Sequence, residues 1–204
     1  MAYILAMIGG YLLGCSNMAY YLAILNHTDL RGGGSGNLGA SNATVLLGWR
    51  AGALTALHDI GKAFLAVLLL KRLFPQAEHI GVVAGVACVL GHIFPFYLKF
   101  KGGKGFASYL GMTLALNWKL AAVVILAVVL VTVITDYIVW GTVTTILSVP
   151  VYMGVTKGWI PALILGIATL VILYKHRENF PRMLNGTELG LRSALRGENK
   201  LKQK

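Results

Sequence analysis

The stretch LAAVVILAVVLVTVIT, residues 120–135, carries no charge and only two threonines as polar side chains. A helix needs roughly 20 apolar residues to cross a bilayer, and this stretch with its neighbours approaches that length. The whole chain has the same character: 57% of its 204 residues are hydrophobic and only 12% are charged. This composition excludes an ordinary soluble domain and predicts an all-α, polytopic integral membrane protein.

Further apolar segments lie on both sides of this stretch. The shortest, 106–116, crosses a bilayer only if it is tilted or the bilayer is thin there. The break at Asn117-Trp118-Lys119 nevertheless indicates that the chain turns after it. We therefore expect about seven transmembrane helices. The predicted spans are about residues 3–25, 53–70, 80–98, 106–116, 120–135, 137–155 and 159–174.

The positive charges are unevenly divided between the two sides that these spans define. Because cytoplasmic loops are rich in lysine and arginine, the richer side is predicted to face the cytoplasm. The N-terminus is then outside and the C-terminus inside. Residues 1–190 would form a single membrane-embedded domain and residues 191–204 a basic cytoplasmic tail. The richer side receives Arg31, Arg50, Lys99, Lys101, Lys104, Lys175, Arg177, Arg182, Arg192, Arg196, Lys200, Lys202 and Lys204, and the poorer side Lys71, Arg72, Lys119 and Lys157.

A glycine-rich loop, RGGGSGNLGASN at residues 31–42, separates the first two spans. Successive glycines can turn several backbone N–H groups toward one point and so bind a phosphate. The loop lacks the Gly-Lys-Ser/Thr ending of a nucleotide-binding P-loop, which excludes that function. A flexible connector is the alternative.

Two further polar segments fall on the same predicted side. The turn FKGGKG, residues 100–105, carries lysines suited to phosphate, or merely anchors the topology. The segment HRENFPR, residues 176–182, would place His176 and Asn179 on one helix face. Asp59 and Lys62 enter a span from this side as a neutralising pair, and His92 leaves the next span toward it. Ionisable groups inside spans mark a functional site by default.

Several kinds of chemistry are absent from the sequence. The chain has only seven acidic residues, and none has metal-ligand spacing with histidine. There is no GxSxG elbow or HxxxxD pair, and Cys15 and Cys88 lie in apolar runs as small buried hydrophobes. We therefore expect no metal, no cofactor and no nucleic-acid partner, and a site that binds phosphate for transfer chemistry.

Five motifs in order resemble the bacterial acyl-phosphate:glycerol-3-phosphate acyltransferases, the PlsY-type family. They are SGNLGASN at 35–42, DIGK at 59–62, GHIFP at 91–95, FKGGKGFA at 100–107 and HRENFPRMLNGTE at 176–188. The resemblance implies transfer of a fatty acyl group from acyl phosphate to the 1-hydroxyl of sn-glycerol 3-phosphate. The products would be lysophosphatidic acid and phosphate, and neither acyl-CoA nor acyl carrier protein would serve as donor. It also implies the bacterial inner membrane, with the active site on the cytoplasmic face.

The chain departs from the family pattern at three positions. Ser41 replaces a threonine, and Val45 replaces a common arginine for which Arg50 is the expected substitute. Pro181 replaces a residue compatible with a helix, which limits how far a helix continues after His176.

The resemblance and the residue chemistry together predict a set of site residues. Direct attack by the glycerol hydroxyl is expected, with Lys104 stabilising the leaving phosphate and the substrate phosphate accepting the proton. Ser35 as an acyl-carrying nucleophile is the alternative, although no base partner is evident. The predicted catalytic residues are Ser35, Lys104, His176 and Asn179, and the predicted substrate-binding residues are Gly33, Gly34, Gly36, Asn37, Asn42, Arg50, Lys62, His92, Gly103, Arg182 and Glu188.

Two other classes of function compete with an enzyme. A transporter of a phosphorylated anion also uses glycine-rich breaks in its spans. A lipid-binding scaffold would dock its basic tail, residues 192–204, on anionic headgroups. The polar loops gather at one face rather than at the midplane and no internal repeat is visible, so the enzyme is favoured. The expected partners are acyl phosphate, glycerol 3-phosphate and membrane lipid, with the chain acting as a monomer.

Overall fold

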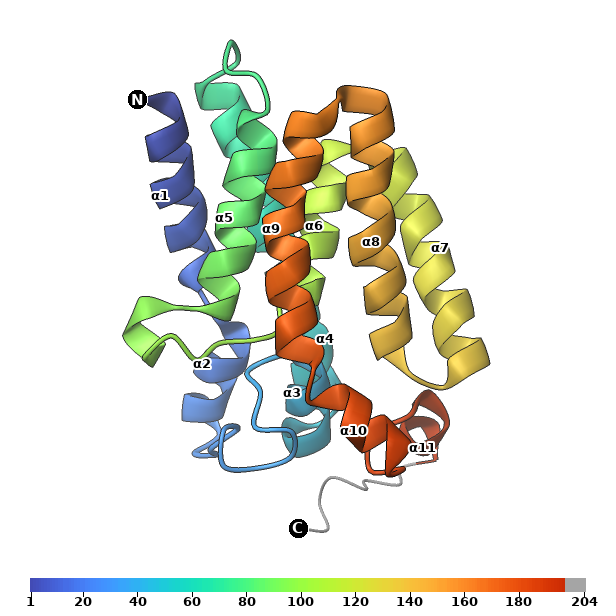
Figure 1. Cartoon of the computed structure of the whole chain (residues 1–204). Coiled ribbons are helices and arrows are strands. Elements are labelled where there is room, and N and C mark those ends of the chain that lie inside the picture. Colours follow the sequence, from blue (N-terminus) through green and yellow to red (C-terminus); the bar gives the residue numbers. More distant parts are fainter. Residues whose placement is uncertain (197–204) are drawn as a thin grey trace.

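The computed structural model describes residues 1–196, and the regular secondary structure in this part of the chain is entirely helical (Figure 1). A 3-10 turn, Phe96–Leu98, follows the fifth helix. The helices are α1 (Ala2–Cys15), α2 (Met18–Leu25), α3 (Ala40–Leu47), α4 (Trp49–Leu73), α5 (Ile80–Ile93), α6 (Phe106–Leu116), α7 (Trp118–Thr135), α8 (Ile138–Lys157), α9 (Trp159–His176), α10 (Asn179–Leu184) and α11 (Leu191–Leu195).

Among the described residues, 6 helical segments are long and apolar enough to cross a membrane. This confirms the predicted all-helical, multi-pass membrane protein. The remaining predicted span, 106–116, is the 11-residue helix α6, which is shorter than a bilayer requires. The other segments are Ala2–Leu25, Trp49–Leu73, Ile80–Leu98, Trp118–Thr135, Ile138–Lys157 and Trp159–His176.

The first predicted span, 3–25, is two helices rather than one. The chain breaks at Ser16 and Asn17; the backbone of Asn17 is extended, and its side chain accepts a hydrogen bond from the N–H of Tyr20 at 2.9 Å. Asparagine is a strong N-cap because its side-chain oxygen satisfies a free N–H at the helix start. The hydropathy of the segment hides this break.

The third predicted span, 80–98, is α-helical only as far as Ile93. Pro95 cannot continue the ladder of helical hydrogen bonds, and the chain turns back through Lys99 and Phe100, which both have positive φ angles. The N–H of Gly102 then donates to the carbonyl of Ile93 at 3.0 Å. The loop 99–105 is thereby folded against the end of α5.

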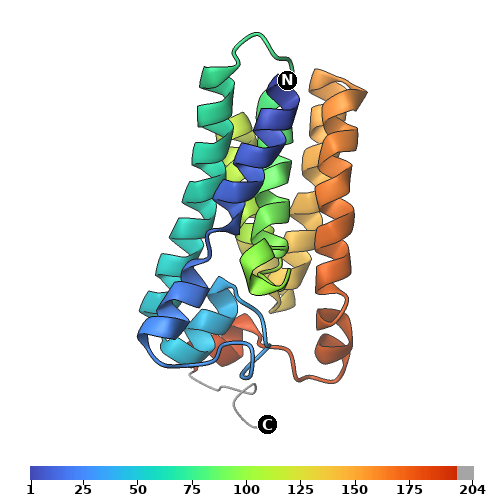
Figure 2. The ribbon, with the colours of Figure 1, turned by 90° about the vertical axis from the view of Figure 1, so that its left-hand side faces the viewer.

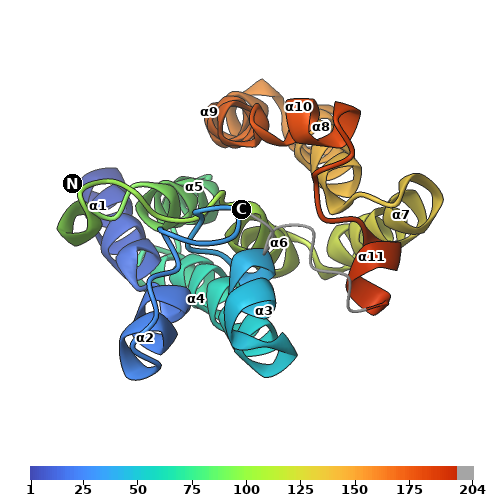
Figure 3. The same ribbon diagram turned by 90° about the horizontal axis from the view of Figure 1, so that it is seen from below.

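Close helix contacts depend on glycine at two positions of α1. A Cβ on Gly10 would overlap the carbonyl oxygen of Ala84, and one on Gly14 the carbonyl oxygen of Cys88, both in α5. These two glycines therefore allow α1 to lie directly along α5 (Figure 2). The view from below separates α1–α4 from α8 and α9, with α5 and α6 joining them (Figure 3).

The polar segments all lie at the end of the bundle opposite to the N-terminus (Figures 1 and 2). This end carries the loop 26–39, the loop 99–105 and helices α10 and α11. The predicted tail, 191–204, starts inside the described part of the chain. Its first residues form α11, where the N–H of Leu191 donates to the carbonyl of Asp136 at 2.7 Å. Residues 197–204 lie outside the described residues.

Candidate active site

A cavity of about 410 Å³ opens among the polar segments at this end of the bundle. Its wall has a polar part and an apolar part. One part is polar and comes from the glycine loop, α4, α5, the loop before α6, and the start of α10. The other part is apolar and is formed mainly by Phe106, Leu110, Ile138, Val139, Leu189 and Leu191. Such a cavity suits an amphipathic ligand with an anionic head and a hydrocarbon chain.

A chain of polar contacts begins at Lys104 in the cavity wall. The ammonium of Lys104 donates to Oδ1 of Asn179, and Nδ2 of Asn179 donates to Oε1 of Glu188 at 2.7 Å. The other carboxylate oxygen of Glu188 accepts from Nε of Arg182 at 2.8 Å. The segment 176–188 thus closes on itself and presents Asn179 to Lys104, although the two lie 75 residues apart in sequence.

Burial lowers the pKa of Lys104 to about 8, and the nearby guanidinium of Arg182 adds to the shift. The carboxylates of Glu188 and Glu178 act in the opposite direction. The ammonium is therefore poorly compensated in the free protein. An anion arriving beside Lys104 would supply the missing negative charge, as expected of a phosphate-binding lysine.

His176, at the end of α9, has a defined tautomer. Its Nδ1 lies 2.8 Å from the carbonyl oxygen of Ile172, which can only accept, so Nδ1 carries a proton. In the neutral ring Nε2 is then an acceptor, and His176 lines the cavity. It can accept a hydrogen bond from a substrate hydroxyl. Sequence could not assign this orientation.

Asn42 holds the glycine loop in place. Its Oδ1 accepts the N–H of Ser35 at 2.8 Å, and its Nδ2 donates to the carbonyl of Leu30 at 2.7 Å and, more weakly, to that of Gly33 at 3.3 Å. Gly34, with a positive φ of 58°, supplies a turn that other residues adopt at a cost. The loop brings Ser35 to the cavity, but the N–H of Ser35 is already bonded to Asn42.

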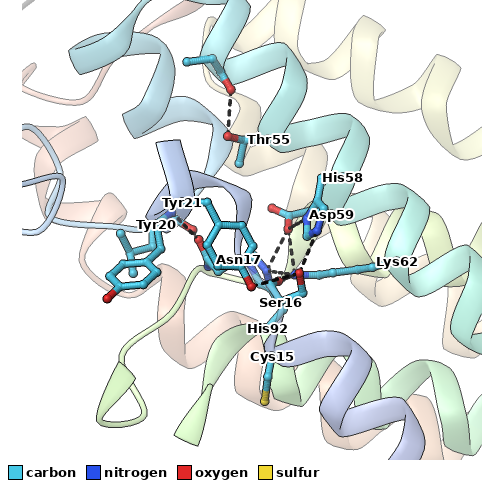
Figure 4. Close-up of polar contacts among 12 residues, drawn as sticks. Cys15, Ser16, Asn17, Tyr20, Tyr21, Thr55, His58, Asp59, Lys62 and His92 are labelled. Carbon is cyan, nitrogen blue, oxygen red and sulfur yellow. Dashed lines mark hydrogen bonds and ion pairs between the residues drawn. The ribbon is translucent and has the colours of Figure 1, made fainter. Parts of the chain in front are cut away.

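A buried polar network lies beneath the cavity, where α4 and α5 meet the break between α1 and α2 (Figure 4). Nζ of Lys62 lies 2.8 Å from Oδ1 of Asp59, which confirms the predicted pairing. Lys62 also contacts Nδ1 of His92 at 2.9 Å and the carbonyl of Ser16 at 2.6 Å. Asp59 and His92 line the cavity, whereas Lys62 does not.

The structure brings most predicted site residues together and leaves others outside the cavity wall. Arg50 is exposed, with its guanidinium 5.6 Å from the ring of Trp49. Pro181 sits in the first turn of α10, where its missing N–H has no helical partner to lose, so the helix continues past it. In the wall are Ser35, Asn37, Asn42, His92, Lys104, His176, Asn179 and Glu188, and outside it are Gly33, Gly34, Gly36, Arg50, Lys62, Gly103 and Arg182.

Some lining residues were not predicted. Asp59 was interpreted only as the partner of Lys62, and Ser41 only as a family variation. Thr132 in α7 and Thr142 in α8 also line the cavity. Their signal in the sequence is weak, since threonines inside spans usually bond their own helix, as Thr142 does to Ile138 at 3.1 Å.

The fold and the cavity define an integral membrane protein in which a pocket joins polar and cationic side chains to an apolar wall. The sequence model described as glycerol-3-phosphate acyltransferase matches residues 4–186. The chain belongs to the glycerol-3-phosphate acyltransferase family.

Individual relatives agree over nearly the full length. The chain is 34% identical over 200 residues to "Glycerol-3-phosphate acyltransferase 1" of Oceanobacillus iheyensis, covering 95% of this chain and 97% of the relative. It is 37% identical over 192 residues to the glycerol-3-phosphate acyltransferase of Clostridioides difficile, covering 92% and 94%. A crystal structure of PlsY (YgiH), an integral membrane glycerol 3-phosphate acyltransferase in its glycerol 3-phosphate form, superposes with a TM-score of 0.87. That structure is 31% identical, and the match covers 96% of this chain and 98% of that one.

Proposed function

We propose that this protein transfers a fatty acyl group from an acyl phosphate to the 1-hydroxyl of sn-glycerol 3-phosphate. As a member of its family the chain is a membrane glycerol-3-phosphate acyltransferase. What we propose beyond this is the acyl donor, the role of each residue and the side of the membrane on which the active site lies. The observation that carries it is the joining of the Lys104–Asn179–Glu188 chain to an apolar wall in one cavity.

The two substrates share one chemical feature, a phosphate, and differ in the rest. The apolar wall suits the hydrocarbon chain of an acyl phosphate, which is dissolved in the bilayer. The polar end suits glycerol 3-phosphate, with His176 and Asn179 in the cavity wall to form hydrogen bonds to it. Arg182 lies outside the cavity wall and is proposed to act through Glu188, which accepts a hydrogen bond from its Nε at 2.8 Å.

The reaction is proposed to be a direct displacement. The 1-hydroxyl oxygen of glycerol 3-phosphate attacks the acyl carbonyl carbon, the bond from that carbon to the phosphate oxygen breaks, and phosphate leaves with the hydroxyl proton. Lys104 stabilises the charge that grows on the departing phosphate, an effect usually worth about 3–4 kcal/mol. Nε2 of His176 accepts the hydrogen bond that orients the hydroxyl.

Ser35 is proposed to bind substrate rather than to carry the acyl group. Within the described residues its Oγ has no hydrogen bond to a histidine, lysine or carboxylate. A serine nucleophile needs such a base to lose its proton. Its hydroxyl can still donate to a phosphate oxygen at the cavity wall.

The active site is proposed to face the cytoplasm at the bacterial inner membrane. The end of the bundle that holds the cavity also carries Lys99, Lys101, Lys104, Arg177 and Arg182, whereas the opposite end carries few lysines or arginines. This is the distribution that the positive-inside rule associates with the cytoplasmic face. Water-soluble glycerol 3-phosphate would then enter from the cytoplasm.

The test is a reaction in detergent, where no compartments exist. Purified protein is mixed with palmitoyl phosphate and glycerol 3-phosphate without added metal, and phosphate and lysophosphatidic acid are measured. Both products should form with wild-type protein and with Lys157→Ala at the opposite end, and both should be nearly lost in Lys104→Ala. Product from palmitoyl-CoA but not from palmitoyl phosphate would refute the proposed donor. No product from either donor, with uptake of glycerol 3-phosphate into liposomes, would favour a transporter.

A further inference from the structure

The buried network of Asp59, Lys62 and His92 contains charges that the reaction as described does not use. The side chains of Asp59, Lys62 and His92 are 2%, 6% and 3% exposed. Unpaired charge inside a membrane span is costly, so a buried carboxylate and ammonium are expected to balance each other. With Asp59 negative and Lys62 positive, the group is electrically neutral only if His92 is neutral.

The contacts of Lys62 decide where the proton of His92 lies. An ammonium has three N–H donors and no lone pair. Three acceptors surround Nζ of Lys62 at hydrogen-bond distance: the Ser16 carbonyl at 2.6 Å, Oδ1 of Asp59 at 2.8 Å and Nδ1 of His92 at 2.9 Å (Figure 4). Nδ1 therefore uses its lone pair, and the single ring proton belongs on Nε2. The longer approach of Nδ1 to Oδ1 of Asp59, 3.3 Å, is to an oxygen that already accepts from Lys62.

The Nε2 edge of His92 lies beside the loop that carries Lys104. A Cβ on Gly103 would overlap Nε2, so the ring lies against the backbone of that glycine. The N–H of Gly103 also donates to the carbonyl of His92 at 3.1 Å. His92 lines the cavity, and within the described residues its Nε2 has no hydrogen-bond partner. A fixed N–H donor thus stands free next to the phosphate-binding lysine.

We infer that Asp59 and Lys62 are positioning residues that hold His92 as its Nε2–H tautomer. In this state His92 donates a hydrogen bond to a phosphate oxygen of the substrate that lies beside Lys104. The inference rests on the proposed function and assigns Lys62 an indirect role, because all three of its donors are already used. His92 supplies recognition without a further positive charge in the membrane.

Two substitutions of His92 test the roles of its Nδ1 and its Nε2 separately. Glutamine places an amide N–H donor near the position of Nε2, whereas asparagine offers an acceptor near Nδ1 but no donor toward the cavity. His92→Asn should raise the KM for a phosphate substrate about tenfold to a hundredfold, as expected for a hydrogen bond to a charged group. His92→Gln should restore most of the loss.

The KM values for palmitoyl phosphate and for glycerol 3-phosphate are measured separately. The substrate whose KM rises is the one that His92 contacts. Wild-type KM values in His92→Asn, or equal losses in the two variants, would overturn the inference.

A second pair of variants tests Asp59 and Lys62. Asp59→Asn leaves a buried ammonium without its counter-charge and should lower the unfolding temperature. Asp59→Asn/Lys62→Met removes both charges and should recover that temperature. The KM for the substrate that His92 contacts should nevertheless be higher than in wild type, because His92 is no longer held. Recovery of both quantities would show that the pair is merely structural. Thr169→Val, which removes a buried hydrogen bond to Ile146 away from the cavity, is the matched control for stability.

A spectroscopic measurement covers the case in which the variants fail to fold. Wild-type protein with isotopically labelled histidine reports the tautomer of each ring by NMR. The signals of His92 are those missing in His92→Gln or, if that variant is not obtained, those that still respond to phosphate in His176→Gln, since both rings line the cavity. A ring protonated at Nδ1 would refute the inference. If wild-type protein forms no lysophosphatidic acid, the proposed function fails. Binding of inorganic phosphate to wild type and His92→Asn then tests the role of His92 alone.

Discussion

The ammonium of Lys104, in the loop before α6, donates a hydrogen bond to the amide oxygen of Asn179 at the start of α10. This contact joins two halves of the bundle, since α6 packs mainly on α4 while α10 continues from α9. Both residues line the cavity. The contact makes the cavity sensitive to changes on either side of it.

The activity should fall as the pH rises through the pKa of Lys104. Burial lowers that pKa from 10.5 to about 8, so the ammonium is lost above this value in the free protein. The alkaline limb should appear near pH 8 in kcat/KM, which reports the free enzyme, and at higher pH in kcat, since bound phosphate favours the ammonium. Steady-state rates over pH 6–10 test this, with roughly one-unit sampling. Lys104→Arg should remove the limb, and a limb that persists in this variant would assign it to another group.

Glu188→Ala should lower both stability and activity. It removes the acceptor of Asn179 Nδ2 and of Arg182 Nε, leaving two partly buried donors unpaired. A loss of about 1–3 kcal/mol in the free energy of unfolding is expected, together with a lower kcat/KM. Glu178→Ala, at an exposed carboxylate near the same helix, is the control. Equal behaviour of the two variants would contradict the role of Glu188.

Asn42→Asp should release the glycine loop. The carboxylate can still accept from the N–H of Ser35, but the donors to the carbonyls of Leu30 and Gly33 are lost. We expect a KM about tenfold higher for at least one substrate, because Ser35 is no longer fixed at the cavity. Asn26→Asp, which alters an exposed contact to Leu22, should leave both KM values near wild type. An unchanged KM in Asn42→Asp would mean that the loop is held without this side chain.

Gly14→Ala and Gly166→Ala should have opposite effects on stability. A Cβ on Gly14 would overlap the backbone of Cys88, so α1 must move away from α5 at a cost of about 1–3 kcal/mol. A Cβ on Gly166 in α9 meets nothing within 4 Å, and alanine should stabilise the helix by about 0.5–1 kcal/mol. Thermal unfolding in the same detergent compares the two. A stabilised Gly14→Ala would refute the close α1–α5 contact.

Local signals in the sequence predicted most helix positions and missed the breaks that depend on single side chains. Hydropathy placed α7 and α9 within a few residues, because an apolar stretch of that length satisfies its backbone hydrogen bonds internally. It missed the end of α1, where Asn17 restarts the chain as α2. Because hydropathy is averaged over a window of residues, it does not reveal a helix break caused by one capping residue.

The sequence by itself determined that the chain is a bundle of membrane helices and that its glycine-rich and basic segments gather at one end. Both follow from hydropathy and from the alternation of spans, which are properties of segments. Only the tertiary structure decided that Asp59 and His92 line the cavity while Arg50 faces away, and that Lys104 meets Asn179. These relations depend on the rotation of each helix about its axis and on how loops fold back. Such features are set by packing between segments that are distant in sequence.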